Sequence, residues 1–319
     1  MYRVRSLHRL GGFIADLPTP FNDGGGIDWA AFEMLCEHQV KAGATAIVVG
    51  ETMGEASTLS PREHAEIVGA AVRIMRGRAA VVAGASSNST SQAIELTASA
   101  EAKGADAILS VVPYYNKPMQ AGMLAHFRAI AASTDLPIIV HDNPSRTMRE
   151  ISDETILRLS ESPQFAGLNE STGSLARFAR LRSMLPGEFR LLCGNDVNAM
   201  AYLASGGDGC ISMVANLFPE LCHRGYDDCM AGSIRAVTSL SGRLGTLNNL
   251  LAGDSPVAAL KYGLSRLGLM KAFVRLPLVE LGEDAKAALA SAMATAFGPG
   301  HRSDQSSASF PPARRSHSR

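Results

Sequence analysis

Four consecutive side chains that can hydrogen-bond, Asn169 to Thr172, follow the apolar run of residues 165–168. The leucines and the phenylalanine of residues 174–185 then recur at helical spacing. An amide, a carboxylate and two hydroxyls therefore come at the point where a predicted strand gives way to a predicted helix. In folds that alternate strands and helices, ligands bind at strand ends of this kind.

The segment 50–55 also follows a short apolar run, residues 46–49. It contains Glu51, Thr52 and Gly54, and its two glycines allow backbone N–H groups to converge on an anion such as a carboxylate. We therefore expect an anion-binding turn after this strand.

Two more polar segments carry side chains suited to binding and proton transfer. Tyr114 and Tyr115 lie between prolines, where a phenol can deliver a proton, clamp a ligand or pack at a subunit contact. His141 ends another apolar run and is either an acid–base group or a hydrogen-bonded structural residue. Arg146 presents a planar guanidinium that suits a carboxylate ligand or a neighbouring aspartate.

The elements that would position these residues repeat one pattern, a short apolar strand followed by a helix. Eight strands are predicted, at residues 12–21, 46–50, 80–85, 107–113, 137–141, 165–168, 189–193 and 209–213. Helices are predicted at residues 27–40, 119–134, 152–161, 174–185 and 197–205, and two more begin at Ser60 and Ser89. Both serines match the spacing of a capping box, with Glu63 and Gln92 three residues later.

Strands that are apolar throughout indicate a parallel sheet covered by helices, which is an α/β fold. A closed (β/α)8 TIM barrel satisfies eight strand–helix units most directly. The alternative is a doubly wound open sheet, but no Gly-x-Gly-x-x-Gly motif follows the first strand. We predict an irregular N-terminal segment at 1–11, the barrel at 12–232, a C-terminal helical bundle at 233–297 and a disordered tail at 298–319.

The composition favours a globular protein with a large core and a small-molecule ligand. Of 319 residues, 46% are hydrophobic, and 30 basic residues balance 30 acidic ones. No net field would then attract nucleic acid or an anionic membrane. The sequence has no run of eighteen apolar residues, so we expect a cytoplasmic protein without a membrane span. The five scattered cysteines are expected to be reduced thiols.

Over roughly residues 12–297, the chain resembles the family of dihydrodipicolinate synthase and N-acetylneuraminate lyase. The motifs that carry the resemblance are Thr52-Met53-Gly54-Glu55-Ala56-Ser57-Thr58-Leu59, Val112-Pro113-Tyr114-Tyr115-Asn116-Lys117-Pro118, Asn143-Pro144-Ser145-Arg146-Thr147, Asn169-Glu170-Ser171-Thr172-Gly173 and Gly194-Asn195-Asp196. The resemblance implies a (β/α)8 barrel with a C-terminal helical bundle, aldolase-type chemistry on pyruvate, and a homodimer or homotetramer. The synthase branch is the more similar one.

The resemblance also assigns roles to residues at the strand ends. In the family, a lysine at the position of Asn169 forms a Schiff base with pyruvate, and a tyrosine and a threonine at the positions of His141 and Met53 relay protons. Asn169 cannot form an imine, because its amide nitrogen is delocalised into the carbonyl. Methionine offers no proton, and a histidine titrates about three units below a phenol. The three reactive groups at positions 53, 141 and 169 are therefore replaced.

The binding equipment of the family is retained. The resemblance places substrate-binding residues at Glu51, Thr52, Gly54, Arg146, Gly194 and Ile211. Tyr115 is expected to deliver a proton or clamp the ligand. His64, Asn88 and Gln92 fall where the family has an effector site for lysine, although exposed polar residues at helix starts explain them as well.

Two groups are candidates to replace the lysine amine. Lys117 is the only one of six lysines predicted on the catalytic face. A divalent metal is the other candidate, although no fixed ligand spacing supports it and neither a metal nor a cofactor is predicted. Its ligands would be Glu51, His141, Asp142, Glu170 and Asp196.

The leading hypothesis is a dihydrodipicolinate synthase-like protein that binds a small keto acid or related carboxylate without forming a Schiff base. One version is an enzyme of altered chemistry that uses His141 as acid or base, with Glu51 and Asn169 orienting the substrate. The alternatives are a non-catalytic carboxylate-binding or regulatory protein, and a metal-assisted lyase.

Overall fold

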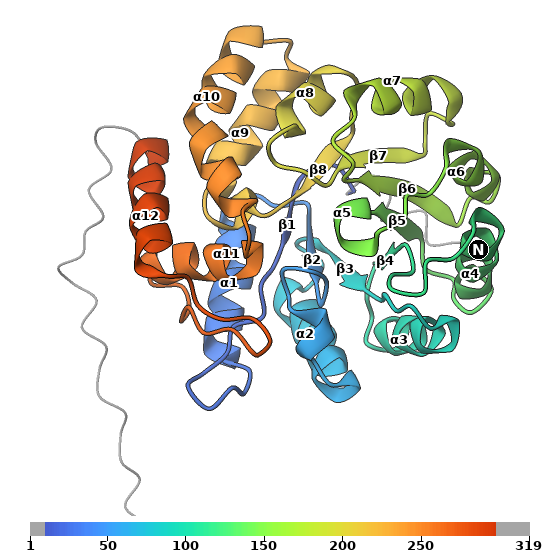
Figure 1. Ribbon diagram of the computed structural model, residues 1–319, viewed down its shortest axis with the longest axis horizontal. Coiled ribbons are helices and arrows are strands. Elements are labelled where there is room, and N and C mark those ends of the chain that lie inside the picture. Colours follow the sequence, from blue (N-terminus) through green and yellow to red (C-terminus); the bar gives the residue numbers. More distant parts are fainter. Residues whose placement is uncertain (1–9, 298–319) are drawn as a thin grey trace, which may run out of the picture.

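The computed structural model describes residues 10–297, and its centre is a closed barrel of eight parallel strands (Figure 1). The strands are β1 (Gly12–Asp16), β2 (Ala46–Val49), β3 (Ala80–Gly84), β4 (Ala107–Val111), β5 (Ile138–Asp142), β6 (Phe165–Glu170), β7 (Arg190–Cys193) and β8 (Gly209–Ser212). They follow one another in sequence order, and β8 pairs with β1 to close the barrel. The predicted (β/α)8 TIM barrel is confirmed, and the open sheet is wrong.

The strand boundaries differ from prediction at the two strands that matter most for the site. β1 ends at Asp16, because Pro18 and Pro20 have no N–H to continue the ladder. β6 runs two residues further than expected, so Asn169 and Glu170 pair with His141 and Asp142 inside the sheet. The polar residues of β6 are therefore held by strand hydrogen bonds and do not lie in a loop.

Helices connect the strands and surround the barrel (Figure 1). They are α1 (Trp29–Lys41), α2 (Pro61–Met75), α3 (Thr90–Ala102), α4 (Gln120–Ala131), α5 (Pro144–Thr147), α6 (Asp153–Ser160), α7 (Leu175–Met184) and α8 (Ala199–Ala204), with 3-10 turns η2 (Ala56–Thr58) and η3 (Val214–Asn216). Every predicted helix between strands is present. α5 was not predicted, because four residues are too few to show helical periodicity.

The two predicted capping boxes have different outcomes. Ser60 caps α2 as predicted: its hydroxyl accepts from the Glu63 N–H, and the Glu63 carboxylate accepts from the Ser60 N–H. The box at Ser89 is wrong, because its side chain makes no cap hydrogen bond and instead contacts the Ser91 hydroxyl at 3.0 Å. The Gln92 amide oxygen accepts from Ser87 and is not available to the backbone of Ser89.

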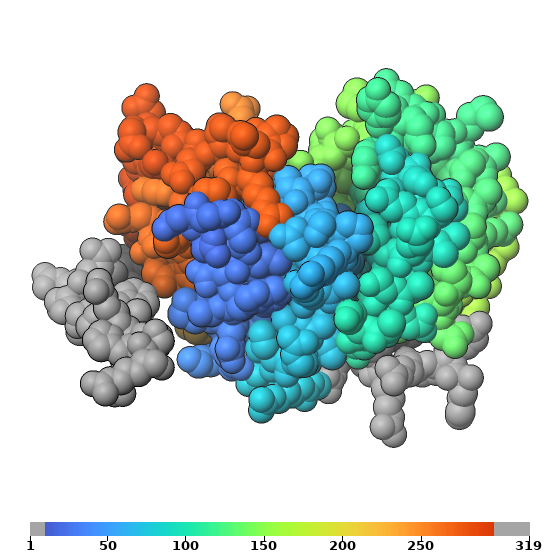
Figure 2. All heavy atoms as spheres, turned by 90° about the horizontal axis from the view of Figure 1, so that it is seen from below, coloured from blue at the N-terminus to red at the C-terminus, as the bar shows by residue number. Residues whose placement is uncertain are grey.

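Four further helices follow β8. They are α9 (Pro219–Met230), α10 (Ile234–Leu251), α11 (Pro256–Arg266) and α12 (Glu283–Phe297). They gather on one side of the barrel, where Figure 2 shows the orange C-terminal segment lying against the blue N-terminal one. The division at residue 233 stays a prediction, and most of the segment predicted at 1–11 and all of the tail at 298–319 lie outside the described residues.

Two hydrophobic cores follow from the alternation of side chains along each strand. Alternate residues fill the barrel interior, namely Leu10, Ile14, Ala46, Val48, Ala80, Val82, Ala107, Leu109, Ile139, Leu192 and Ile211. The larger core lies between the barrel and its helices. All five cysteines are free, as expected. None of the helices within residues 10–297 has the length and apolar character that a membrane crossing needs.

Candidate active site

A polar layer closes the barrel interior at the carboxyl ends of the strands. Side chains two residues apart on a strand point to the same face, so Asp16 continues the inward face of Ile14 and His141 that of Ile139. By the same spacing, Asn169 and Ser171 share the inward face of β6. The structure therefore brings together one residue from β1, one from β5 and two from β6 and its end.

His141 is the centre of this layer. Its Nδ1 lies 3.3 Å from Oε1 of Glu51, and its Nε2 lies 3.1 Å from the Ser171 hydroxyl. His141 and Glu51 are both buried, whereas Ser171 is partly exposed. The imidazole thus connects a buried carboxylate to a hydroxyl that solvent can reach.

Asn169 lies directly beside His141, since the two residues are register partners in β5 and β6. Its side chain is only 1% exposed, and its Oδ1 has no hydrogen-bond partner among residues 10–297. The amide packs closely against Gly194, where an added Cβ would lie 3.0 Å from both of its terminal atoms. A buried amide with an unused acceptor is a group prepared for a polar ligand.

The turn after β2 is already occupied by carboxylates of the chain itself. The N–H of Thr52 donates to Glu51, and the N–H of Met53 donates to Oδ2 of Asp16 at 3.2 Å. The carbonyl of Gly54 accepts from Thr19 at 2.6 Å. The N–H groups of Thr52 and Met53 are two of the backbone donors expected to bind a substrate anion. In this structure they bind the carboxylates of Glu51 and Asp16 instead.

The pKa values of the Asp16 and Glu51 carboxyl groups are shifted in opposite directions. Burial raises the pKa of Asp16 well above its usual value, and the neighbouring charge of Glu51 raises it further. Burial also opposes ionisation of Glu51, but hydrogen bonds from His141 and Thr52 and the attraction of the imidazole lower its pKa to about 2. Neighbouring acids that are separated in this way typically divide into a neutral and an ionised member.

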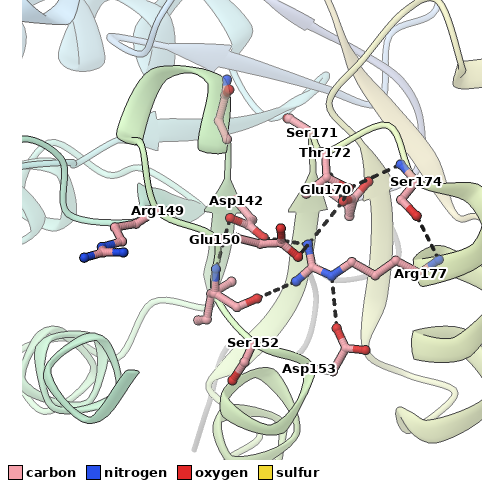
Figure 3. A network of polar contacts seen from close by, with 12 residues as sticks. Asp142, Arg149, Glu150, Ser152, Asp153, Glu170, Ser171, Thr172, Ser174 and Arg177 are labelled. Carbon is pink, nitrogen blue, oxygen red and sulfur yellow. Dashed lines mark hydrogen bonds and ion pairs between the residues drawn. The ribbon is translucent and has the colours of Figure 1, made fainter. Parts of the chain in front are cut away.

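Asp142 and Glu170 alternate with the inward residues and point outward, between the barrel and its helices (Figure 3). There they surround the guanidinium of Arg177, at 2.7 Å and 3.3 Å, together with Asp153 at 3.0 Å. The Tyr202 hydroxyl donates to the other oxygen of Glu170. This network positions β5, β6 and the helices after them.

The five proposed metal ligands therefore do not converge. Asp196 bonds the Ser212 hydroxyl and the N–H groups of Met213 and Val214, and so belongs to the end of β8. Glu51 and His141 contact each other on the inner side, whereas Asp142 and Glu170 bind Arg177 on the outer side. Within the described residues, no group of three or more His, Cys, Asp or Glu side chains is arranged to hold a metal ion.

A cavity of about 520 Å³ opens beside the polar layer and is lined by Glu51, Thr52, Arg146 and Tyr114. Arg146 is exposed and is not engaged by an ion pair within residues 10–297. A cavity of similar size lies at the other end of the barrel, where Arg128 and Arg158 line it between α4 and α6. The first cavity is the better candidate, because it is the one that adjoins the polar layer at the carboxyl ends of the strands.

The remaining predicted site residues occupy three different environments. Met53 is buried in the core between barrel and helices, and Ile211 lies in the barrel interior below the polar layer. Tyr115 is 89% exposed, with a φ of 67°, so it does not contact His141 within this chain. His64 lines the cavity, but its Nε2 is already paired with the Gly84 carbonyl at 2.6 Å.

No lysine occupies the polar layer in the described part of the chain. Lys117 is exposed in the loop after β4 and does not line the cavity. Lys261 is fully buried, but its amine donates to Glu55 and to the Phe273 carbonyl. Its ammonium also lies 4.1 Å from the ring centre of Phe21.

The sequence alone assigns no catalytic or substrate-binding role to two residues of the polar layer, Asp16 and Ser171. Asp16 is the only charged residue in β1. Because it lies two residues after Ile14, strand alternation predicts that its side chain also points into the barrel interior. Ser171 is two residues after Asn169 and shares its face by the same argument. Its contact with His141, however, depends on the neighbouring strand and is not visible in the sequence.

The fold and the layer define a class, the (β/α)8 barrel proteins with a ligand site at the carboxyl ends of the strands. A profile of the Dihydrodipicolinate synthetase family matches residues 9–296, and the chain belongs to that family.

Curated relatives and solved structures agree with this membership. The chain is 42% identical over 290 residues to the 4-hydroxy-tetrahydrodipicolinate synthase of Hyphomonas neptunium, covering 89% of this chain and 98% of the relative. It is 39% identical over 291 residues to that of Laribacter hongkongensis, covering 90% and 99%. The dihydrodipicolinate synthase of Acinetobacter baumannii, solved with pyruvate, superposes with a TM-score of 0.88 at 36% identity, covering 90% and 99%. That of Aquifex aeolicus gives 0.87 at 35%, covering 89% and 97%.

Proposed function

We propose that this protein binds a small keto acid or related carboxylate at the barrel mouth and acts on it, if at all, without a lysine Schiff base. The observation that carries the proposal is the position of Asn169. Its buried amide lies in the polar layer beside His141, with an oxygen that lacks a partner within residues 10–297. A carboxamide in this position can hydrogen-bond a keto acid but cannot become an imine.

Arg146 is the proposed anchor of the ligand carboxylate. It lines the cavity and is free of intrachain ion pairs in the described residues, while the Thr52 and Met53 N–H groups are occupied. A guanidinium binds a carboxylate through two parallel hydrogen bonds. The relative solved with pyruvate supports a keto acid of this size as the ligand class.

His141 is the proposed acid–base group of an enzyme with altered chemistry. It is held between Glu51 and Ser171 and lies beside Asn169, so a ligand bound at Asn169 would lie near its imidazole. If the protein only binds its ligand, the non-catalytic alternative holds. Turnover that is lost in His141→Ala, while ligand binding remains, distinguishes the enzyme from the binding protein.

Borohydride reduction in the presence of labelled pyruvate tests the Schiff-base part of the proposal. We expect no label on the natural protein. We expect label on Asn169→Lys, because a lysine amine in this buried position has a lowered pKa and is nucleophilic. Label on the natural protein would contradict the proposal, and its mapped site would show whether Lys117 reacts.

Titration calorimetry with pyruvate tests the anchor. Replacing Arg146 by Gln should weaken binding about ten- to a hundredfold, since a charged hydrogen bond contributes about 1.5–3 kcal/mol. Arg149→Gln is the matched control, because Arg149 is exposed near the cavity but does not line it. Equal affinity in both variants would place the ligand elsewhere.

Assembly and location remain proposals. Tyr115 and Met119 are 89% and 81% exposed in the loop region after β4. Two large side chains exposed so close together support a subunit contact there, and with it the homodimer or homotetramer. We also propose a cytoplasmic location, and an effector role for His64, Asn88 and Gln92.

A further inference from the structure

Glu51, His141 and Ser171 form a line of carboxylate, imidazole and hydroxyl across the barrel mouth. The carboxylate contacts one ring nitrogen at 3.3 Å, and the hydroxyl contacts the other at 3.1 Å. The three side chains come from the ends of β2, β5 and β6, so the barrel itself holds them in place. This is the relation of base, orienting acid and nucleophile in serine hydrolases, which is recognised by geometry and not by sequence order.

The direction of the hydrogen bonds follows from the charges. Glu51 is held ionised, so it accepts a proton from Nδ1 of His141. With Nδ1 donating to Glu51, Nε2 is the ring nitrogen that can accept from the Ser171 hydroxyl. A hydroxyl that donates to such a nitrogen is activated as a nucleophile.

The Ser171 hydroxyl and the Asn169 amide lie next to each other beside Gly194. An added Cβ at Gly194 would lie 1.9 Å from the Ser171 oxygen and 3.0 Å from the Asn169 amide nitrogen. The hydroxyl and the amide therefore both pack against Gly194 and lie close to each other. An asparagine amide at about 3 Å from a developing oxyanion is one of the donors that stabilise acyl-transfer transition states.

We propose that Ser171 is a nucleophile, with His141 as its general base and Glu51 as the positioning residue, in the hydrolysis of a short ester or lactone that carries a free carboxylate. Arg146, which lines the adjoining cavity, holds that carboxylate. The Asn169 amide donates to the carbonyl oxygen. The activity would use the same Arg146 and Asn169 that are proposed to bind a keto acid, but it does not require a keto acid to be bound.

The reaction is a double displacement with water as the second reactant. His141 Nε2 takes the Ser171 proton as the oxygen bonds to the acyl carbon, and the carbonyl π electrons move to the oxygen. Collapse breaks the bond to the leaving alkoxide, which takes the proton from His141. Water then attacks the acyl-serine, gives a proton to His141, and releases the acid as Ser171 recovers its proton.

Labelling with a fluorophosphonate, followed by peptide mass spectrometry, tests the proposal directly. We expect one phosphonyl group per chain on Ser171, and no label in Ser171→Ala. The labelling rate should fall on the order of a hundredfold in His141→Asn, since general-base assistance is lost. Ser145→Ala is the matched control, because Ser145 is an exposed serine near the same cavity that bonds only Asn143 in the described structure. Labelling elsewhere, or an unchanged rate in His141→Asn, would overturn the proposal.

A second measurement uses the natural protein and so does not depend on the folding of a variant. p-Nitrophenyl hydrogen succinate should release a burst of one p-nitrophenolate per chain, whereas neutral p-nitrophenyl acetate should react more slowly. The burst rate should increase with pH as the general base becomes available. A burst whose rate does not increase with pH, or no burst, contradicts the proposal, while pyruvate binding remains a separate result.

Discussion

Two carboxyl groups, Asp16 at the end of β1 and Glu51 just after β2, interact electrostatically in the polar layer at the barrel mouth. A buried pair of this kind shares one negative charge, and the hydrogen bonds decide which member holds it. Glu51 receives bonds from His141 and from the Thr52 backbone, so it is the ionised one. The charge thus lies next to the imidazole, where it fixes the tautomer.

Gly194 is the residue on which the space around Ser171 depends. In Gly194→Ala, the new methyl group would clash with the Ser171 oxygen at 1.9 Å and displace it from His141. We expect fluorophosphonate labelling of Ser171 to fall by at least about tenfold, with a stability cost of about 1–3 kcal/mol from overpacking. The labelling rate and a denaturant titration measure the two effects.

Gly187→Ala is the matched control for this substitution, since nothing lies within 4 Å of a Cβ at that position. Unchanged labelling in Gly194→Ala would mean that Ser171 does not need its observed position.

At the scale of elements, the alternation of side chains along β5 and β6 places the site residues on the inner face of the barrel and an ion network on its outer face. Along β5 and β6, His141 and Asn169 point inward while Asp142 and Glu170 point outward. The outward pair is bound by Arg177 of α7, which also bonds Asp153 at the start of α6. The site is therefore held by an ion network on the opposite face of the strands that form it.

Arg177→Met should destabilise the protein by about 3–5 kcal/mol, because it leaves the buried carboxylates of Asp142 and Glu170 without their cation. Thermal and denaturant unfolding measure the loss. Arg180→Met is the control, since Arg180 contacts the same Asp153 but is 55% exposed, and such pairs contribute about 1 kcal/mol or less. Similar losses in the two variants would refute this account.

At the scale of the molecule, the helices after β8 are joined to the barrel through one buried ion pair. Lys261 of α11 donates to Glu55, which follows the turn beside the site and also accepts from the Arg275 N–H at 3.0 Å. Glu55 has a φ of 54°, a strained conformation for a residue with a Cβ. The segment after β8 therefore helps to hold the end of the turn after β2, together with the contacts from Asp16 and Thr19.

Lys261→Met should cost about 3–5 kcal/mol of unfolding free energy, because the Glu55 carboxylate would remain buried and unpaired. Lys271→Met, which removes an exposed pair with Asp23, should change stability by about 1 kcal/mol or less. Chemical denaturation of both variants checks the difference. A small effect at Lys261 would show that α11 is held by apolar packing alone.

Buried histidines should make the whole protein sensitive to acid. Burial lowers the pKa of His126 to about 4, so between pH 6.5 and 4 the unfolded chain binds a proton that the folded one does not. Stability is complete above pH 6.5 and falls as the pH drops towards 4, by about 2 kcal/mol for this group after allowance for solvent screening.

Urea unfolding at several pH values measures this slope, and His126→Gln should reduce it by one proton. The lowered pKa values of His38, His64 and His223 should remain as a common background. The same slope in protein and variant would rule out His126 as a source.

The sequence determined the architecture, because apolar strand runs and helical periodicity are local properties of the chain. It also located the polar strand ends, and it showed from the chemistry of its side chain that Asn169 cannot be an imine-forming nucleophile. Such local patterns do not always predict contacts: the capping box predicted at Ser89 does not form, because Gln92 accepts a hydrogen bond from Ser87 instead.

Only the tertiary structure decided which polar residues meet. Glu51 and Ser171 are 120 positions apart in the printed numbering, and the closing of the barrel around His141 places them on either side of one ring. The same closure sends Asp142 and Glu170 to the outer face and fills the expected anion turn with the chain's own carboxylates. Pairing register and side-chain alternation, which are set between strands, determine these contacts.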